Sequence, residues 1–533
     1  MGAIVSYIIC ALLSYGIFYL FCPAINFMAP GFWVYLIIVL LLFCGVSFSI
    51  RTFKDEDEGP TTVIGIITGV GSAILVVIML FAALFGSHLF RAKDYANLIA
   101  GRVESKSITE YTPTIDNVPL MDRDTAELLA NRTMGSLVEE VSQFDLGRSW
   151  QINYQGRPIR VVPLEYAGFF KWINNKAKGI PSFITVDMKT QRTEIHTLEQ
   201  GMRYSPSGYF GDDLRRHLRF MYPTTMMSEP IFEIDEEGNP YWVVSKLTHR
   251  IGLFGGEDVT GILIVDAITG DIKEYEMEDI PRYVDNAFSV DVLLNLYNNY
   301  GMYQGGFWNA HFGQKNVVQV TEGYNYIPKD DDIYVYTGVT SVASDESNIG
   351  FIFVNMRTKA YEYYEIAGAE EYSAMASAEG VVQHLGYTST FPLILSIEGQ
   401  PTYCVALKDA GGLVKMYGLV NMEQYQIVVT GNTIADCLRD YRVALKNNGQ
   451  SVIEIAVTEN KGVVEDIRTG SINGTTMFYI KFENDKSYYS FMLSENENII
   501  LIDIGDEIKY NIADDETSEG YTSEKIIPAT LVE

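Results

Sequence analysis

Two long charge-free tracts open the chain. Met1 to Ile50 and Gly59 to Phe90 contain no Asp, Glu, Lys or Arg, and only the segment Arg51 to Glu58 between them is charged. A helix needs roughly 20 mostly apolar residues to cross a bilayer core, which disfavours the alternative of a buried soluble hairpin. Because Pro23 and Pro30 interrupt the first tract, the pattern predicts three membrane-spanning helices within residues 1–90, near 3–21, 32–50 and 62–85.

The basic residues near these helices give two opposing signals about orientation. The loop at residues 22–31 lacks Lys and Arg whereas the second helix is followed by both, which favours the first loop outside the cell. Arg91, Lys93 and Arg102 follow the third helix and favour a cytoplasmic domain. Since the rule weakens for long translocated domains, we favour a cell-membrane protein with an extracytoplasmic large domain. The first residues show neither a basic segment nor a cleavage site, so we expect an uncleaved anchor.

Beyond a polar juxtamembrane connector at residues 91–121, one order of elements recurs four times. An amphipathic helix precedes apolar and alternating stretches typical of antiparallel strands. The sequence therefore predicts four α+β units with a trailing helix within residues 122–447, at about 122–200, 211–280, 285–367 and 369–430. Their unequal spacing favours a compact tandem array over a regular solenoid.

Turn residues support this alignment. Gly and Pro stand between two strands in QGRP at Gln155, EGNP at Glu237 and EGQP at Glu398, while the third unit has PKDD. A later strand of each unit ends in Val followed by Asp or Asn, at Val186, Val265, Val354 and Val420. Gly frees the backbone for a tight turn, and Asp or Asn can accept a hydrogen bond from the backbone of the next residues.

The units resemble the PepSY family, in which a helix precedes a three-stranded sheet ending in a V-D-x-x-T-G hairpin. VDAITGDIKEY from Val265 is the nearest match, VDMKTQRTEI from Val186 is partial, and the last two units lack the Gly. The resemblance extends at most from Asp124 to Thr430. It implies an extracytoplasmic protein-binding or regulatory module, sometimes linked to peptidases or cell-wall enzymes. The whole chain also resembles membrane-anchored proteins of Gram-positive bacteria.

The last part of the chain, residues 450–533, has a different pattern. Short alternating runs without a helical period follow Ser451, and an Asn-Gly turn lies at Asn473. Five or six such strands predict a small closed β-barrel of the OB or SH3-like kind. We therefore expect a membrane anchor of three α-helices, a tandem array of α+β units and a C-terminal small β-barrel.

The composition of the large domain limits its partners. The formal charge is −29, and the first ninety residues contribute only two basic and four acidic residues to it. Such a field repels nucleic acid and anionic surfaces, so we expect no nucleic-acid partner. Only Cys404 and Cys437 lie beyond the predicted spans, too few for a disulfide framework or zinc site. We interpret them as buried small residues, and a bridge between them would require an oxidising compartment.

Motifs for catalysis or metal binding do not emerge. The six histidines include no pair spaced as metal ligands on one helix face, and the chain has no GxSxG, HExxH or P-loop motif. Acidic runs at 235–237 and 330–332 offer oxygen ligands for Ca²⁺ but do not match EF-hand spacing. We therefore predict no catalytic residue, no metal site and no cofactor.

Two groups of residues are candidates for binding. Arg215, Arg216 and Arg219 flank His217 in the only basic cluster of the acidic domain, and such side chains bind carboxylate or phosphate unless neighbouring acids pair with them. The second group lies in the glycine-rich stretch NNYGMYQGGFWNAHFG, which predicts a loop. Aromatic side chains on flexible backbone suit a peptide or glycan, and the alternative is a buried plug between units. Its candidate residues are Tyr303, Phe307, Trp308 and His311.

These features favour a noncatalytic, membrane-anchored envelope protein that acts as a scaffold or as a protein- or peptide-binding module, with oligomer formation possible. The alternative is an enzyme, or a regulator of a cell-wall or peptidase enzyme, with a site between the repeat units near Trp308, His311 and the arginine helix. A transporter is disfavoured because the charge-free tracts offer no residue for an ion path.

Overall fold

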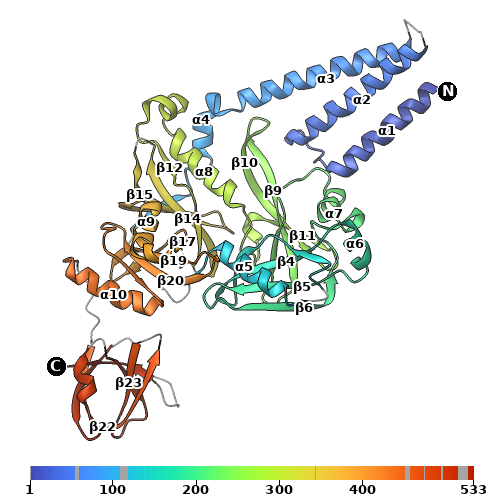
Figure 1. Ribbon diagram of the computed structural model, residues 1–533. Helices are drawn as coiled ribbons and strands as arrows, with labels where there is room; N and C mark the ends of the chain where they lie inside the picture. The colour runs from blue at the N-terminus through green and yellow to red at the C-terminus, as the bar shows by residue number, and fades with distance from the viewer. Residues whose placement is uncertain are drawn as a thin grey trace. The chain divides into compact units, whose positions relative to one another are not determined.

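Three N-terminal helices in the computed structural model are long and apolar enough to cross a membrane. They are α1 (Gly2–Phe21), α2 (Pro30–Lys54) and α3 (Pro60–Phe85) (Figure 1). Their positions agree with the charge-free tracts and support a membrane anchor. The structure describes residues 2–54, 59–107, 118–137, 140–329, 331–342, 344–450, 457–472, 475–493, 496–513 and 526–532.

Small residues let α2 and α3 pack closely. Gly65 and Gly69 lie one turn apart on α3, and both face α2. A Cβ atom added to Gly65 would lie 3.2 Å from Cβ of Ser47, and one added to Gly69 would lie 3.1 Å from Sγ of Cys44. Such spacing of glycines is typical of helix contacts in membranes, where close backbone approach replaces the hydrophobic driving force.

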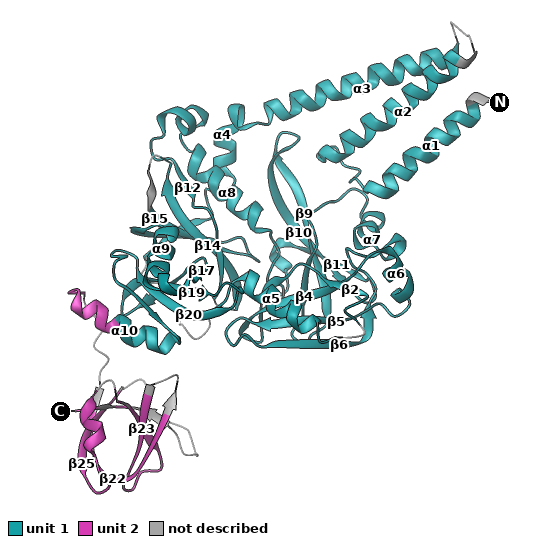
Figure 2. Cartoon of the chain, viewed as in Figure 1, with its two compact units in different colours: residues 1–441 teal, residues 442–533 magenta. Residues whose placement is uncertain are grey.

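The chain divides into two compact units, residues 1–441 and 442–533 (Figure 2). The first unit holds four mainly antiparallel sheets. The strands of the first sheet are β2 (Phe144–Leu146), β3 (Trp150–Tyr154), β4 (Arg157–Tyr166), β5 (Ile180–Asp187) and β6 (Thr193–Met202). Those of the second are β7 (Met226–Met227), β8 (Ile231–Ile234), β9 (Pro240–Ile251), β10 (Gly255–Asp266) and β11 (Ile272–Glu276).

The other two sheets of this unit follow in chain order. The third contains β12 (Val318–Val320), β13 (Asn325–Lys329), β14 (Asp332–Ser341), β15 (Ser344–Asn355) and β16 (Tyr361–Ala369). The fourth contains β17 (Thr388–Ser389), β18 (Leu393–Ile397), β19 (Gln400–Lys408), β20 (Val414–Asn421) and β21 (Val428–Gly431). In every sheet, two short strands pair with the same edge of a longer third strand, and the fourth and fifth strands extend the other edge.

Helices precede or connect these sheets. They are α4 (His88–Asn97), α5 (Arg123–Met134), α6 (Phe169–Asn175), α7 (Leu214–Met221), α8 (Val290–Tyr303), α9 (Glu371–Val381) and α10 (Ile434–Asn447). Within the segment predicted as a connector, α4 packs on α8, and β1 (Val103–Lys106) joins the third sheet in parallel with β16. Residues 108–117 lie outside the described part of the chain.

The Asp or Asn at each Val-Asp or Val-Asn position accepts backbone hydrogen bonds at a turn. Oδ1 of Asp187, Asp266, Asn355 and Asn421 accepts from the N–H groups two and three residues ahead, at 2.8–3.1 Å. The Gly turns before β4, β9 and β19 likewise have positive φ, which Gly adopts without strain. The predicted Asp or Asn turn is therefore present in all four sheets, and the predicted Gly turn in three of them.

Two predicted elements differ in the structure. The apolar pattern of the first unit predicts a helix from Asp124 to about Phe144. In the structure α5 ends at Met134, because Gly135 follows it, and Phe144 starts β2. The stretch expected as a glycine-rich loop is largely helical: α8 continues to Tyr303, and a π-helical turn η5 covers Asn309–Gly313. The prediction failed at Gly301 because that glycine lies inside α8, where Val318 leaves no space for a Cβ atom.

The C-terminal unit contains a six-stranded sheet bent into a half-barrel. Its strands are β22 (Val457–Ile472), β23 (Thr475–Phe482), β24 (Tyr488–Met492), β25 (Glu507–Ala513), β26 (Ile526–Pro528) and β27 (Thr530–Leu531). The described pairings run from β26 to β27 without joining those two strands, so a closed barrel stays a prediction. The apolar run that begins at Asn498 predicts a strand, but residues 497–501 form a 3₁₀ turn. The predicted turn at Asn473 lies outside the described residues.

Candidate functional site

A pocket of about 220 Å³ lies where the first sheet meets segments of the third and fourth predicted units. Its walls come from the N-terminus of α5, from β3 and β4, from the start of β13, and from Phe391, which precedes β18. The residues that line it include Asp122, Arg123, Asp124, Arg148, Ser149, Trp150, Gln151, Arg160, Tyr324 and Tyr326. Distant parts of the chain therefore build one concavity.

Arg160 is a buried cation in this pocket. It lies on β4, and only 4% of its surface is exposed. Its Nη1 donates to the carbonyl oxygen and to Oγ of Ser149, at 3.3 and 2.9 Å, whereas its Nε has no hydrogen-bond partner. No carboxylate of the described residues forms an ion pair with it, and burial lowers the pKa of Arg160. The same Ser149 hydroxyl donates to Oε1 of Glu127 at 2.7 Å, so that carboxylate acts on Arg160 only through the hydroxyl. A buried charge without a direct carboxylate partner is costly, so this guanidinium favours an anion from outside.

Gln151 beside it is also unsatisfied. Its side chain is 3% exposed, and neither Oε1 nor Nε2 has a partner among the described residues. Because buried side-chain amides are nearly always hydrogen-bonded, an amide without partners at a pocket wall indicates a bound polar group. Gln151 adds one donor and one acceptor beside the donors of Arg160.

The other charged groups of the pocket are compensated or exposed. Nε of Arg123 donates to Oε1 of Glu127 at 2.8 Å, and the carboxylate of Asp122 pairs with Lys408 at 2.5 Å. Arg148 lies 4.3 Å above the ring of Trp150, so its charge faces an aromatic surface rather than an acid. Asp124, in the first turn of α5, adds a negative charge to the rim. The net field in the pocket is therefore only modestly positive.

Aromatic side chains line the opposite wall. The rings of Tyr324 and Tyr326 meet edge to face at 5.6 Å, and Phe391 and Trp150 also border the cavity. A pocket with apolar walls and a few convergent polar groups is the usual form of a small-ligand site, although this one is smaller than most sites for drug-sized ligands. It suits a single side chain or chain end that carries one anionic group.

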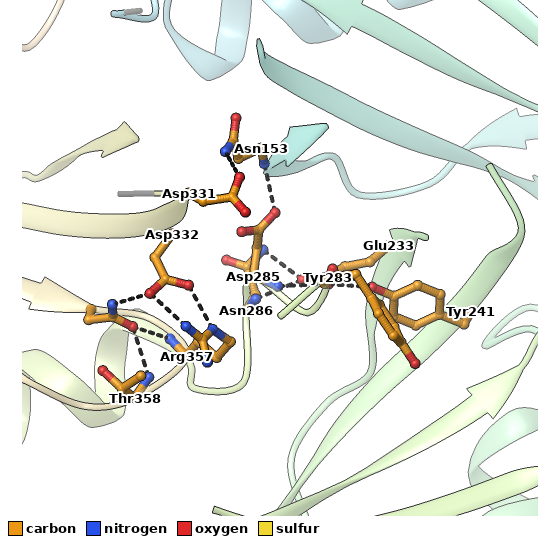
Figure 3. A network of polar contacts seen from close by, with 11 residues as sticks. Asn153, Glu233, Tyr241, Tyr283, Asp285, Asn286, Asp331, Asp332, Arg357 and Thr358 are labelled. Carbon is orange, nitrogen blue, oxygen red and sulfur yellow. Dashed lines mark hydrogen bonds and ion pairs between the residues drawn. The ribbon is translucent and has the colours of Figure 1, made fainter. Parts of the chain in front are cut away.

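A buried polar network holds the backbone of β3 (Figure 3). The side-chain amide of Asn286 donates to the carbonyl oxygen of Gln151 at 2.9 Å and to Oε1 of Glu233 at 2.8 Å. The backbone N–H of Asn153 donates to Oδ2 of Asp285 at 2.6 Å. The backbone that carries Gln151 is therefore positioned by residues of the second sheet and of the segment leading to the third.

Glu233 is the centre of that network and is fully buried. Its carboxylate accepts four hydrogen bonds: from the backbone N–H groups of Asp285 and Asn286, the amide of Asn286 and the hydroxyl of Tyr241, at 2.8–3.1 Å. Burial raises the pKa of Glu233, and these donors oppose that rise. Burial first, and then the nearby Glu233 charge, hold the pKa of Asp285 well above its ordinary value. We infer that Glu233 is the ionised member of the pair.

The predicted arginine cluster lies at the end of the membrane anchor. Nε of Arg216 donates to the carbonyl oxygen of Tyr19 at 3.2 Å, and Nε of Arg219 donates to that of Cys22 at 2.9 Å. Arg215 instead pairs with Glu229 at the surface. Two of the three arginines thus bind carbonyl groups at the C-terminal end of α1, where cations are favoured by the helix dipole.

The predicted aromatic group is divided between the surface and the interior. Trp308 is 69% exposed and stacks with the exposed Phe312 at 5.7 Å. Tyr303 is buried and stacks on His88 at 4.6 Å, while the rings of Phe307 and His311 lie 4.4 Å apart. None of these side chains lines the pocket around Arg160. The arginine cluster and the aromatic group therefore lie in different parts of the fold, and neither belongs to the pocket around Arg160.

Sequence reasoning did not single out the pocket residues. Arg160 occurs in the strand run RPIRVVPLEY, where a cation at a position that alternates with apolar residues is the only signal of an unusual environment. Gln151 gave no signal. Among the described residues, no group of three or more His, Cys, Asp or Glu side chains is arranged for a metal ion. Cys404 and Cys437 are both buried as free thiols.

No family model and no curated protein matches the chain. Among solved structures, a GH32 beta-fructofuranosidase from Bombyx mori covers 73% of this chain and 68% of its own at 8% identity, with a TM-score of 0.18. An apocarotenoid oxygenase of Synechocystis covers 54% and 65% at 10% identity (TM-score 0.15), and an exo-beta-1,3-galactanase from Phanerochaete chrysosporium covers 63% and 78% at 10% identity (TM-score 0.16). Similarity at this level transfers neither fold nor function.

Proposed function

We propose that this chain is a membrane-anchored envelope protein that binds a protein or peptide partner through a carboxylate placed in the Arg160 pocket. The observation that carries the proposal is the buried guanidinium of Arg160, which has an unpartnered Nε and lies beside the unpartnered amide of Gln151. The anchor keeps the binding domain at the membrane, and four sheets with one strand order supply the rigid frame.

A carboxylate fits this pocket better than a phosphate. Asp122 and Asp124 also line the cavity, and a dianion would meet both of them. A monoanion needs only the charge of Arg160, which has no direct carboxylate partner, supported by Arg148 in the same pocket. The aromatic wall accepts an apolar neighbour, so an acidic side chain or a C-terminal carboxylate within a peptide satisfies both sides of the cavity.

The PepSY-like reading supports the same assignment. In this proposal the four sheets are copies of one protein-binding unit, held on the extracytoplasmic side of the cell membrane, and the C-terminal strands close into a small barrel. Strands β26 and β27 are separated by one residue and form opposite ends of the pairing order, which supports closure.

An enzyme, or a regulator of a cell-wall or peptidase enzyme, is the second candidate, because the pocket lies between units as such a site would. A binding function is favoured over catalysis, because one of the two carboxylates at the pocket stabilises the fold and the other lies at the pocket rim. Asp122 caps α5 through Thr125 and pairs with Lys408, and Asp124 lies in the first turn of that helix. Burial raises the pKa of Asp122, but hydrogen bonds from Lys408 and Thr125 outweigh it and lower the pKa, which makes Asp122 a weaker base for catalysis.

Photo-crosslinking in cell membranes tests the proposed function. A benzophenone amino acid replaces Tyr324, which lines the pocket and is 37% exposed, and a control places it at Tyr425, an exposed position after β20. We expect a discrete adduct from the first position that disappears when Arg160→Met is added. An adduct unchanged by Arg160→Met, or the same adduct from both positions, would contradict the proposal.

The membrane side is tested separately. A cysteine introduced at Glu533 is treated with a membrane-impermeant maleimide in intact and in broken cells, with the unaltered chain as control for the five native cysteines. Labelling in intact cells is expected. Labelling only after the cells are broken would place the domain in the cytoplasm and remove the extracytoplasmic assignment.

A further inference from the structure

An exposed apolar cluster continues the surface of the membrane anchor onto the large domain. It consists of side chains from α6, from the 3₁₀ turn η3 (Phe210–Asp212) and from α7. Phe170 is 75% exposed, Met221 62%, Phe210 54% and Phe220 49%. Soluble surfaces rarely gather so many large apolar side chains at one place, and such patches mark contact with a partner or a membrane.

Direct contacts join this cluster to α1. The ring of Phe220 lies 6.3 Å from that of Phe18 and 6.1 Å from that of Tyr19, both in the last turns of the helix. The guanidinium of Arg216 lies 4.2 Å from the Tyr19 ring and donates to the carbonyl oxygen of Phe210 at 2.8 Å. Figure 1 shows α7 and α6 beside the end of α1. The cluster therefore begins where the membrane span ends.

The loop between α1 and α2 holds α7 at this boundary. The backbone N–H of Ile25 donates to the carbonyl oxygen of Pro223 at 2.8 Å, and the amide of Asn26 donates to that of Thr224 at 3.0 Å. Together with the bond from Arg219 to Cys22, these contacts tie the segment after α7 to the loop. The position of the cluster is thus set by the anchor.

We propose that Phe170, Phe210, Phe220 and Met221 insert into the lipid leaflet at which α1 ends, so that this face of the large domain lies in the headgroup region. Interfacial segments place their apolar face about 5–10 Å into the boundary between headgroups and acyl chains. Lys171, Lys176 and Lys178 follow in α6 and the turn after it, where their ammonium groups can reach lipid phosphates. The proposal rests on membrane insertion of α1 to α3 and not on the Arg160 pocket.

Lipid is the occupant that the contacts favour over a second protein. The cluster is continuous with the exposed side chains Leu20 and Phe21 at the end of α1, which face outward from the helix bundle and are 70% and 72% exposed. A surface continuous with a lipid-facing helix end meets the same solvent as that helix. Aromatic side chains are enriched at this level of membrane proteins because their rings suit the interface.

Depth-dependent fluorescence quenching tests the proposal in the full chain. Phe170→Cys is labelled with an environment-sensitive dye, and the chain is reconstituted in zwitterionic vesicles with or without lipids that carry a nitroxide on the upper acyl chain. Tyr425→Cys is the control, because Tyr425 is an exposed aromatic residue in the turn between β20 and β21, outside the apolar cluster. The unaltered chain reports background labelling of native cysteines.

We expect the dye at position 170 to lose most of its emission in nitroxide vesicles, whereas the dye at position 425 keeps it. Equal emission at both positions, in chains that co-sediment with the vesicles and resist extraction by high salt, would overturn the proposal. Chains that fail to insert would instead refute the membrane anchor on which it rests. Met221→Ser should reduce quenching at position 170 without changing the urea midpoint, because the Met221 side chain is 62% exposed.

Discussion

The buried pair of Glu233 and Asp285 gives the sharpest prediction about stability. Asp285 is 3% exposed, and both burial and the adjacent Glu233 charge raise its pKa. A carboxyl group whose pKa is higher in the folded state takes up a proton on folding. Its contribution to stability is therefore complete below the ordinary Asp pKa and is lost as the pH rises toward the folded-state pKa.

The replacement Asp285→Asn removes this loss. The neutral amide keeps an oxygen that can accept from the N–H of Asn153, so the hydrogen bond at 2.6 Å is retained. One proton corresponds to about 1.4 kcal/mol of unfolding free energy for each pH unit between the two pKa values. We expect the variant to match the unaltered chain near pH 4 and to become more stable than it as the pH increases.

Urea unfolding of the detergent-solubilised full chain measures this difference. Emission of Trp242 and Trp150, which lie in the second and first sheets, follows the transition at several pH values. Glu233→Gln is the matched comparison. Its new NH₂ group would face two of the four donors that Glu233 now binds, so it should lose about 2–4 kcal/mol.

A gain for Asp285→Asn that does not change with pH would refute the assignment of the proton to Asp285. A gain for Glu233→Gln together with a loss for Asp285→Asn would show that the ionised member of the pair had been chosen wrongly.

Two other substitutions test the frame of the large domain. Gly238→Val should lower the unfolding free energy by about 1–3 kcal/mol, because Gly238 has φ of 83° and a β-branched residue is strained there. An unchanged urea midpoint would contradict the role of this turn. Lys359→Met should lower the unfolding free energy by about 3 kcal/mol, because Lys359 is 3% exposed and pairs with Asp258 between the second and third sheets. An exposed lysine, as in Lys461→Met, is the control. A loss no larger than that of the control would show that the buried pair adds little.

Local chemistry made part of the fold predictable from the sequence. Charge-free tracts identify the three helices that are long and apolar enough to cross a membrane, because ionised groups are excluded from a bilayer core. Asp187, Asp266, Asn355 and Asn421 identify strand ends because their side chains bond to the backbone only two or three residues away. Signals of this kind need no knowledge of tertiary contacts.

The candidate site could not be predicted in the same way. Arg160 and Tyr326 are 166 residues apart and meet only because two sheets pack together. The burial of Arg160 depends on that packing, and its sequence context is an ordinary apolar strand. The arginines of α7 were visible as a cluster, but their carbonyl partners at Tyr19 and Cys22 lie almost 200 residues earlier in the chain.

Binding and stability of Arg160→Met, measured side by side, test the central claim most directly. An array of short peptides with free or amidated C-termini and with Asp or Asn side chains is probed with the full chain and with the variant. Because the side chain of Met fills similar space without a charge, removing an unpaired buried cation should leave the unfolding free energy equal or higher. The account predicts that the full chain prefers carboxylate peptides over their amides and that Arg160→Met abolishes this preference without destabilising the fold. Equal binding by both chains, or no preference for carboxylates, would contradict it.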